Sequence, residues 1–237
     1  MAQRINVGQP GIGTTRTATP RRILYNNHNA MYLPNAGTLD GSESRDATNT
    51  GDLDSLQPGI VLGKITSGGY WVPSFVGLTT AAYTSGGVSL TVGAATAVEL
   101  NRLVGSSGTG EFYCIGAPTA GGTVAVTSCD HSAIDTSTGV ITVTSLGVNK
   151  HSGSLIALVD GRHEPKGILG TDYPVKVTDA DGTSVDQGLP RTLIGGFVQT
   201  AQIINYPAAA NTSLIAWLKS QLRLNGMWTF TDDFGVT

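Results

Sequence analysis

Short apolar runs separated by glycine-containing turns dominate the sequence between residues 56 and 204. Pro58-Gly59 is a turn pair, and Ser67-Gly68-Gly69 separates the apolar residues of 60–65 from those of 70–72. In GVSLTVG, residues 87–93, apolar and polar side chains alternate, as they do in a half-buried strand. Such short runs and frequent turns are typical of antiparallel sheets. The chain is therefore predicted to be mainly β.

Two segments have helical patterns instead. ATAVELNRLVG, residues 95–105, predicts a short helix that ends at Gly105. NTSLIAWLKSQLRLNG, residues 211–226, carries one apolar stripe, can be capped by Asn211 or Thr212, and should end at Gly226. The second segment is the stronger prediction, so we expect a β body with one C-terminal helix.

Residues 1–50 show no sustained alternation of apolar and polar residues with a period of 2 or 3.6. Their first part is basic. The first 39 residues contain four arginines and no acidic residue, so the net charge of −3 leaves −7 for the remainder. A basic arm on an acidic body predicts contact with an acidic partner surface. A merely solvated leader is the alternative. We expect no nucleic-acid partner, because four arginines without a lysine make a weak electrostatic footprint.

The stretch LVDGRHEPKGILG, residues 158–170, places four charged residues and a histidine within seven positions, in a chain in which only 13% of residues are charged. Its His163-Glu164 pair does not start an HExxH metal motif, because Pro165 excludes the required helix. Asp160-Gly161 between two apolar runs predicts a hairpin turn, and polar residues at a turn tip are usually solvated. We therefore interpret the stretch as a turn and expect no enzymatic activity.

The remaining motifs do not support a cofactor or a metal. GSSGTG, residues 105–110, lacks the Lys-Ser/Thr of a phosphate-binding loop, and DADG, residues 179–182, lacks the first and last carboxylates of a calcium loop. Cys114 and Cys129 show no metal-ligand spacing and should stay reduced. Neither a membrane-spanning run nor a signal peptide is present, so we expect no membrane partner and a protein made in a cytoplasm.

Three segments resemble the lambda-type head decoration, or cement, proteins of tailed bacteriophages: LQPGIVLGKITSGGYWVPS (56–74), VDGRHEPKGILGTDYPVKVTD (159–179) and LPRTLIGGFVQTAQIINYP (189–207). The resemblance implies a compact β-barrel or β-clip-like body (51–75 and 155–237), with the C-terminal helix. It also implies an extended N-terminal capsid-binding arm (1–50) and an inserted β-rich subdomain (76–154). The predicted fold class is thus mainly β (α+β).

The same resemblance implies a structural virion protein on the outer surface of the expanded capsid, which it reinforces. Its partners would be the major capsid protein and further copies of itself, as a homotrimer or a dimer. The residues expected to touch the capsid lie in the arm: Arg4, Ile5, Arg16, Arg21, Arg22, Ile23, Leu24 and Tyr25. The alternative is a head or tail fibre protein whose β-subdomain binds a cell-surface receptor or glycan. A sugar-cleaving tail spike is a weaker alternative, because Asp232-Asp233 on a terminal strand is a poor catalytic pair.

Overall fold

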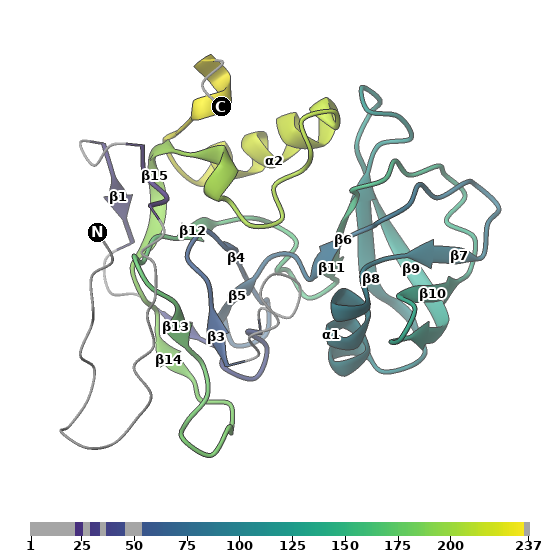
Figure 1. The fold of residues 1–237 in the computed structure, drawn as a ribbon, viewed down its shortest axis with the longest axis horizontal. Helices are drawn as coiled ribbons and strands as arrows, with labels where there is room; N and C mark the ends of the chain where they lie inside the picture. The colour runs from purple at the N-terminus through teal and green to yellow at the C-terminus, as the bar shows by residue number, and fades with distance from the viewer. Residues whose placement is uncertain (1–21, 26–28, 34–36, 46–53, 235–237) are drawn as a thin grey trace.

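The computed structural model describes residues 22–25, 29–33, 37–45 and 54–234, which form two lobes side by side (Figure 1). Each lobe is built on one curled half-barrel sheet, so the mainly β prediction is confirmed. We call residues 77–158 the second lobe and the other described residues the first lobe.

The first lobe contains an eight-stranded sheet and a small two-stranded sheet. In the large sheet the order is β1-β15-β12-β4-β5-β2-β14, and β16 pairs in parallel with β15. β13 and β3 form the small sheet. The strands are β1 (Met31–Tyr32), β2 (Thr38–Leu39), β3 (Ser55–Leu56), β4 (Val61–Lys64), β5 (Trp71–Pro73), β12 (Gly167–Leu169), β13 (Val175–Lys176), β14 (Gln187–Gly188), β15 (Thr192–Val198) and β16 (Trp228–Phe230).

The second lobe contains one six-stranded sheet of order β6-β11-β8-β9-β10-β7, with α1 (Ala94–Val104) packed against β8 and β9. Its strands are β6 (Gly77–Leu78), β7 (Ser89–Thr91), β8 (Gly108–Gly116), β9 (Ala125–Asp135), β10 (Val140–Val143) and β11 (Leu155–Leu158). These bounds lie close to those expected for the β-rich subdomain, 76–154. Its status as an insertion into a family core stays a prediction.

The chain enters and leaves the second lobe at neighbouring points. It passes from β5 to β6 and returns from β11 to β12, and β6 pairs with β11. The segment between β11 and β12 was predicted to be a hairpin turn, and this prediction is wrong. β11 pairs with β6 and β8 in one sheet, whereas β12 pairs with β4 and β15 in the other. The stretch therefore connects two sheets.

Both predicted helices are present. α2 (Thr212–Asn225) lies within the predicted range 211–226, and α1 agrees with 95–105 to within one residue. The apolar stripe of α2 is buried through Leu214, Leu218 and Leu222, which pack in one cluster with residues of both lobes. Two short 3-10 turns, η1 (Thr200–Gln202) and η2 (Thr231–Phe234), complete the first lobe. None of the described helices is both long enough and apolar enough to cross a membrane.

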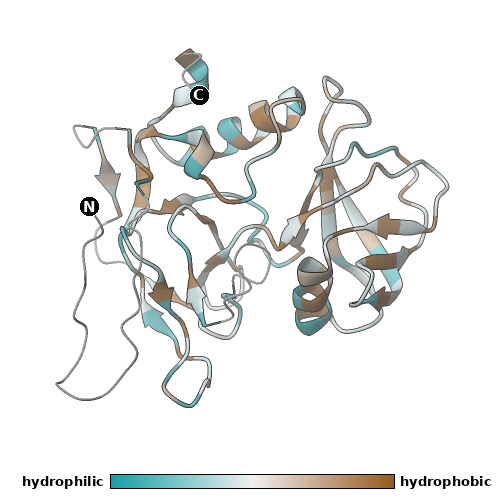
Figure 2. Ribbon diagram, viewed as in Figure 1, coloured by the Kyte–Doolittle hydropathy of each residue, from teal (hydrophilic) through white to brown (hydrophobic). Residues whose placement is uncertain are grey.

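Three clusters of buried apolar residues form the core. One lies within the second lobe, one within the first, and the third joins strands of both lobes to α2. Figure 2 shows the corresponding hydrophobic colour along the strands of each lobe. The joint cluster includes Ile115, Leu155 and Ala157 from the second lobe, so the lobes share buried apolar contacts.

Part of the predicted arm belongs to the first lobe. Ile23 and Leu24 are buried in the joint cluster, and Leu24 makes an antiparallel bridge to Val198 of β15. β1 and β2, which also fall within residues 1–50, pair with β15, β5 and β14. Residues 1–50 were expected to form an arm separate from the body. For the described residues 22–25, 29–33 and 37–45 this prediction is wrong, because they belong to the first lobe. Residues 1–21 lie outside the described residues.

Candidate partner-binding groove

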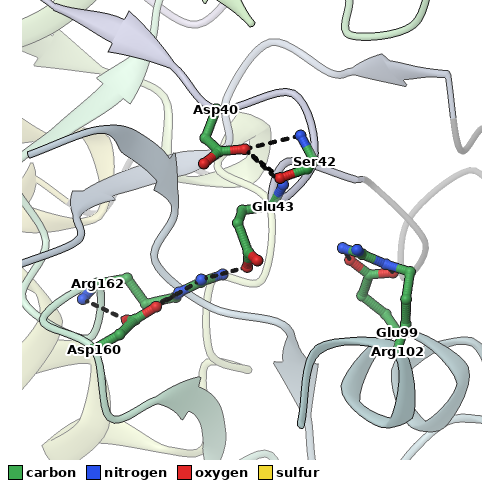
Figure 3. A network of polar contacts seen from close by, with 7 residues as sticks. All are labelled: Asp40, Ser42, Glu43, Glu99, Arg102, Asp160 and Arg162. Carbon is green, nitrogen blue, oxygen red and sulfur yellow. Dashed lines mark hydrogen bonds and ion pairs between the residues drawn. The ribbon is translucent and has the colours of Figure 1, made fainter. Parts of the chain in front are cut away.

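The stretch 158–170 places a buried cation at the junction of the lobes. Arg162 is only 2% exposed, and its guanidinium binds two carboxylates (Figure 3). Nη2 lies 2.6 Å from Asp160 Oδ2 and 2.7 Å from Glu43 Oε2, and Nε donates to Asp160 Oδ2 at 2.8 Å. Asp160 follows β11. Glu43 follows β2 and precedes Arg162 by 119 residues in the sequence. The arginine therefore fastens the interlobe connection to the first lobe.

The backbone around Arg162 is also tightly packed. A Cβ on Gly63 of β4 would stand 2.1 Å from the Arg162 carbonyl oxygen, so only glycine fits there. Across the junction, Arg102 of α1 donates to both oxygens of Glu99, at 2.6 and 2.9 Å (Figure 3). This hydrogen-bonded pair, with weaker contributions from Glu43 and Asp40, raises the pKa of Arg102. The charges at this junction are thus arranged in ion pairs.

The other titratable residues of the stretch have structural partners too. Glu164 and Lys166 form an exposed ion pair at 2.9 Å, and the hydrogen bond from Lys166 lowers the pKa of Glu164. The His163 ring packs edge-on against Tyr113, with centroids 4.7 Å apart. Burial lowers the pKa of His163 despite the nearby carboxylates of Glu164 and Asp160. These contacts agree with a structural role for the stretch.

Asp232 and Asp233 are neutralised by cations of α2. Lys219 Nζ lies 2.7 Å from a carboxylate oxygen of each, and Arg223 Nη2 lies 2.7 Å from Asp233 Oδ2. Burial raises the pKa of Asp233, but the hydrogen bonds from Lys219 and the Phe230 N–H outweigh it, so the net shift is downward. Asp233 is therefore not held in the protonated form that a general acid requires. The pair fixes η2 to α2 instead.

The described residues hold no group of three or more His, Cys, Asp or Glu arranged for a metal ion. Cys114 and Cys129 are free thiols buried in the second lobe. Burial raises the pKa of Cys114 to about 11 and raises that of Cys129 further, so both thiols are protonated near neutral pH. Neutral buried thiols are poor nucleophiles and poor metal ligands.

An open groove lined by both apolar and polar residues is the feature best suited to binding. It lies in the first lobe over β15, between residues 29–31 on one side and 226–229 on the other, and its volume is about 640 Å³. A Cβ on Gly195 would lie 2.8 Å from the Met227 carbonyl oxygen and 3.3 Å from the Met31 sulfur. The glycine therefore lets the two methionine segments approach from opposite sides. The lining residues are Asn29, Ala30, Met31, Gly196, Phe197, Arg223, Gly226, Met227, Trp228 and Thr229.

Aromatic side chains continue the groove at the Phe197 position. The Tyr25 ring packs on Phe197 with centroids 4.7 Å apart, and Phe234 meets Phe197 edge-on at 5.7 Å. Four side chains of this surface are well exposed: Met227 by 77%, Phe234 by 67%, Tyr25 by 48% and Met31 by 44%. A contiguous exposed apolar surface usually marks a site of interaction. Methionine side chains suit such a site because they adapt to irregular partners.

The groove carries little net charge. Among the described lining residues Arg223 is the one that carries a charge, and its guanidinium is paired with Asp233. Arg223 and Lys219 both also lie over the Phe230 ring, each 5.3 Å from its centroid. The surface can therefore bind a partner segment through apolar contacts.

The predicted contact residues fall in three groups. Arg4, Ile5, Arg16 and Arg21 lie outside the described residues. Arg22 and Tyr25 are exposed, and Tyr25 belongs to the groove surface. Ile23 and Leu24 are buried in the protein's own core, so the prediction that they contact a capsid is corrected.

The sequence interpretation did not identify Met31, Phe197 or Met227. Met31 and Met227 lie in or beside strands of two and three residues, and Phe197 follows the Gly195-Gly196 interruption of β15, so the sequence gives no sign of which face each side chain occupies. One local signal in the sequence was available for Met227. It directly follows Gly226, which ends α2, so it lies outside the apolar stripe of the helix, and it is exposed in the structure.

No family model matches the chain, and no curated protein or solved structure is significantly similar to it.

Proposed function

We propose that this chain is a structural virion protein that binds the outer surface of a tailed-phage capsid and stabilises the expanded head. The observation that carries the proposal is the groove with exposed apolar side chains beside Tyr25, at the point where the basic N-terminal segment joins the body. The three motifs that resemble decoration proteins support the same assignment. The ion pairing of the charged residues around Arg162 and Asp233 fits a structural role better than a catalytic one.

In this role the partners are the major capsid protein and other copies of the chain. One groove and one arm give a modest contact, because ordering an extended segment costs about 1–2 kcal/mol per residue in backbone entropy. A closed oligomer that presents several grooves and arms together raises the effective concentration of each contact. A trimer is the form that the family resemblance implies, and a dimer is the alternative.

The fibre hypothesis has one observation in its favour. The second lobe has its own sheet, helix and buried apolar cluster, which makes it a self-contained unit that could present a receptor-binding face. In a fibre protein this lobe would bind the cell surface, and the first lobe would attach to the particle.

The copy number in purified virions distinguishes the two functions. Quantitative mass spectrometry should find the chain in a ratio near one per major shell subunit, or in a simple symmetry fraction of that ratio. The shell protein in the same digest is the internal standard. A few copies per particle would instead identify a fibre protein, and absence from the virion would refute both functions.

A further inference from the structure

The groove is lined by a buried hydrogen-bond donor that the protein itself leaves unused. Trp228 is only 5% exposed, and its indole Nε1–H has no hydrogen-bond partner. Among the described lining residues, this is the one buried side-chain polar atom without a partner. A buried N–H without an acceptor is unfavourable, so a ligand that supplies an acceptor here gains binding free energy.

The packing of Gly226 places this N–H beside the groove. A Cβ on Gly226 would stand 2.9 Å from Trp228 Nε1, and Gly226 is itself a lining residue. The backbone of Gly226 is extended, with φ of −176°, so its conformation does not require glycine. The space does, because the same Cβ would stand 1.6 Å from the Ile194 carbonyl oxygen. Because residue 226 carries no side chain, the indole N–H borders the groove at this point.

The outer edge of β16 is already engaged in hydrogen bonds. The Trp228 carbonyl oxygen accepts from Arg223 Nε at 3.4 Å, and the Phe230 N–H donates to Asp233 Oδ2 at 3.2 Å. The other edge of the strand pairs with β15. These contacts compete with the addition of a further strand to β16. A ligand in the groove is therefore expected to bond to the indole N–H instead.

The charges beside the groove cancel. Lys219 and Arg223 of α2 are paired with the two carboxylates of η2, Asp232 and Asp233. Two positive and two negative groups offer neither an acidic nor a basic ligand a net attraction. Apolar contact with exposed side chains such as Met227 remains. An uncharged peptide fits this chemistry, because its main-chain carbonyl oxygens are neutral acceptors.

We propose that the groove binds an extended, uncharged peptide segment of a partner protein. Its apolar side chains contact Met31 and Met227, and one of its main-chain carbonyl oxygens accepts the Trp228 N–H. β1 and β16, which both pair with β15, border the groove, so its long open shape suits a linear segment. The inference rests on the proposed function only for assigning this segment to the capsid shell.

Nuclear magnetic resonance of the full-length protein with isotope-labelled tryptophan tests the proposal. The probe is a blocked, uncharged peptide in which two leucines alternate with glycines, because alternation places both leucines on one face of an extended backbone. We expect the peptide to shift the Trp228 indole proton downfield in a saturable manner. Trp71 is the internal control, since its Nε1 is also buried without a partner but is not among the described groove-lining atoms. Its signal should not move.

Two variants measure the contacts. Trp228→Phe, followed by the methyl signals of Met31 and Met227, should bind the peptide about tenfold more weakly, because the hydrogen bond is lost. Met227→Ser, followed by the Trp228 signal, should also bind at least about threefold more weakly. Met227 is 77% exposed, so this variant should fold normally. Affinity should change less than about twofold between about 50 and 500 mM salt, because the contact is uncharged.

Several results would overturn the proposal. They are equal shifts at Trp71 and Trp228, unchanged binding by Trp228→Phe, and equal binding of a control peptide with serines in place of the leucines. Tighter binding of a peptide with aspartates there would identify an acidic partner instead. A Trp228 shift that depends on protein concentration without peptide would identify a second copy as the occupant. Virion copy number tests the capsid role separately, because the peptide measurements use the purified chain alone.

Discussion

Two buried cations, one at the lobe junction and one inside the second lobe, are held in different ways. Arg162 is 2% exposed and binds the carboxylates of Asp160 and Glu43. Lys150 is 1% exposed, and its Nζ donates to the backbone carbonyl oxygens of Gly116 at 3.1 Å and Ala125 at 2.6 Å. The first cation is thus compensated by full negative charges, and the second is compensated by dipoles alone.

The difference has a thermodynamic consequence. A charge removed from water is stabilised by a nearby opposite charge, whereas carbonyl dipoles recover less of the lost hydration. Accordingly, burial lowers the pKa of Lys150, since desolvation disfavours its charged form. We infer that Arg162 stabilises the junction and that Lys150 contributes little to stability at neutral pH.

Replacing Arg162 should have the largest effect. Arg162→Met leaves Asp160 and Glu43 without their cation, and removal of one partner of a buried ion pair costs about 3–5 kcal/mol. Both carboxylates are about one-third exposed, so we expect the lower end, about 3 kcal/mol, measured by urea unfolding at pH 7. Arg191→Met is the control, because Arg191 is exposed and should cost less than about 1 kcal/mol. Equal losses in the two variants would contradict the assigned role of Arg162.

Replacing Lys150 should have a smaller effect at neutral pH. Lys150→Met removes a poorly compensated charge and leaves two carbonyl oxygens without that donor, so we expect a net change within about 1 kcal/mol. A loss of about 3 kcal/mol, as large as that for Arg162→Met, would break the contrast between the two cations.

The Lys150 variant should also differ in alkaline solution. A lysine whose pKa is lower in the folded state makes stability rise with pH until its unfolded value of 10.5 is passed. The raised pKa of Cys114 has the opposite effect, since the unfolded thiol ionises first and stability falls above pH 9. Lys150→Met should therefore lose stability more steeply between pH 8 and 10 than the wild type does, by up to about 1.4 kcal/mol per pH unit. Parallel unfolding curves would contradict this.

The smallest effect is expected at His163, next to Arg162. Burial lowers its pKa below the usual 6.5, so on acidification the unfolded chain takes up a proton before the folded chain does. The His163 contribution to stability is consequently lost as the pH falls below 6.5. His163→Gln should flatten the decline in stability between pH 6.5 and 5, measured by thermal unfolding, by less than about 1.4 kcal/mol per pH unit. The junction ion pairs of Arg162 should be unaffected, and an unchanged slope would show that His163 is solvated.

Local sequence patterns predicted the kind of secondary structure well. The helical spacing of apolar residues in 211–226 correctly predicted α2, and the frequent turn residues correctly predicted a mainly β fold. The patterns could not predict which strands pair, because pairing depends on residues far apart in the chain. The Asp160-Gly161 turn signal was therefore interpreted as a hairpin, although it marks a crossing between sheets.

The candidate site was less predictable for the same reason. Arg162 looked like a solvated turn residue because its partner Glu43 lies 119 residues earlier. Ile23 and Leu24 looked like free contact residues because their packing against Val198 is equally remote in sequence. The groove is formed by residues near 30, 196 and 227, and none of these segments is distinctive alone. Of the predicted contact residues that the structure describes, Tyr25 is the one that the fold brings to the groove.

The pairing of β6 with β11 has a mechanical consequence. Leu155 pairs with Leu78 and Ile156 with Gly77, and the Val76 N–H donates to the Ile156 carbonyl oxygen at 2.8 Å. These bonds join the two points at which the chain enters and leaves the second lobe. Tension applied between the ends of the first lobe would reach this short ladder once β4 and β12 had separated, and the ladder would then keep it from residues 79–154. The second lobe would extend only after the ladder had broken, so it would act as a reserve of length released at a threshold force.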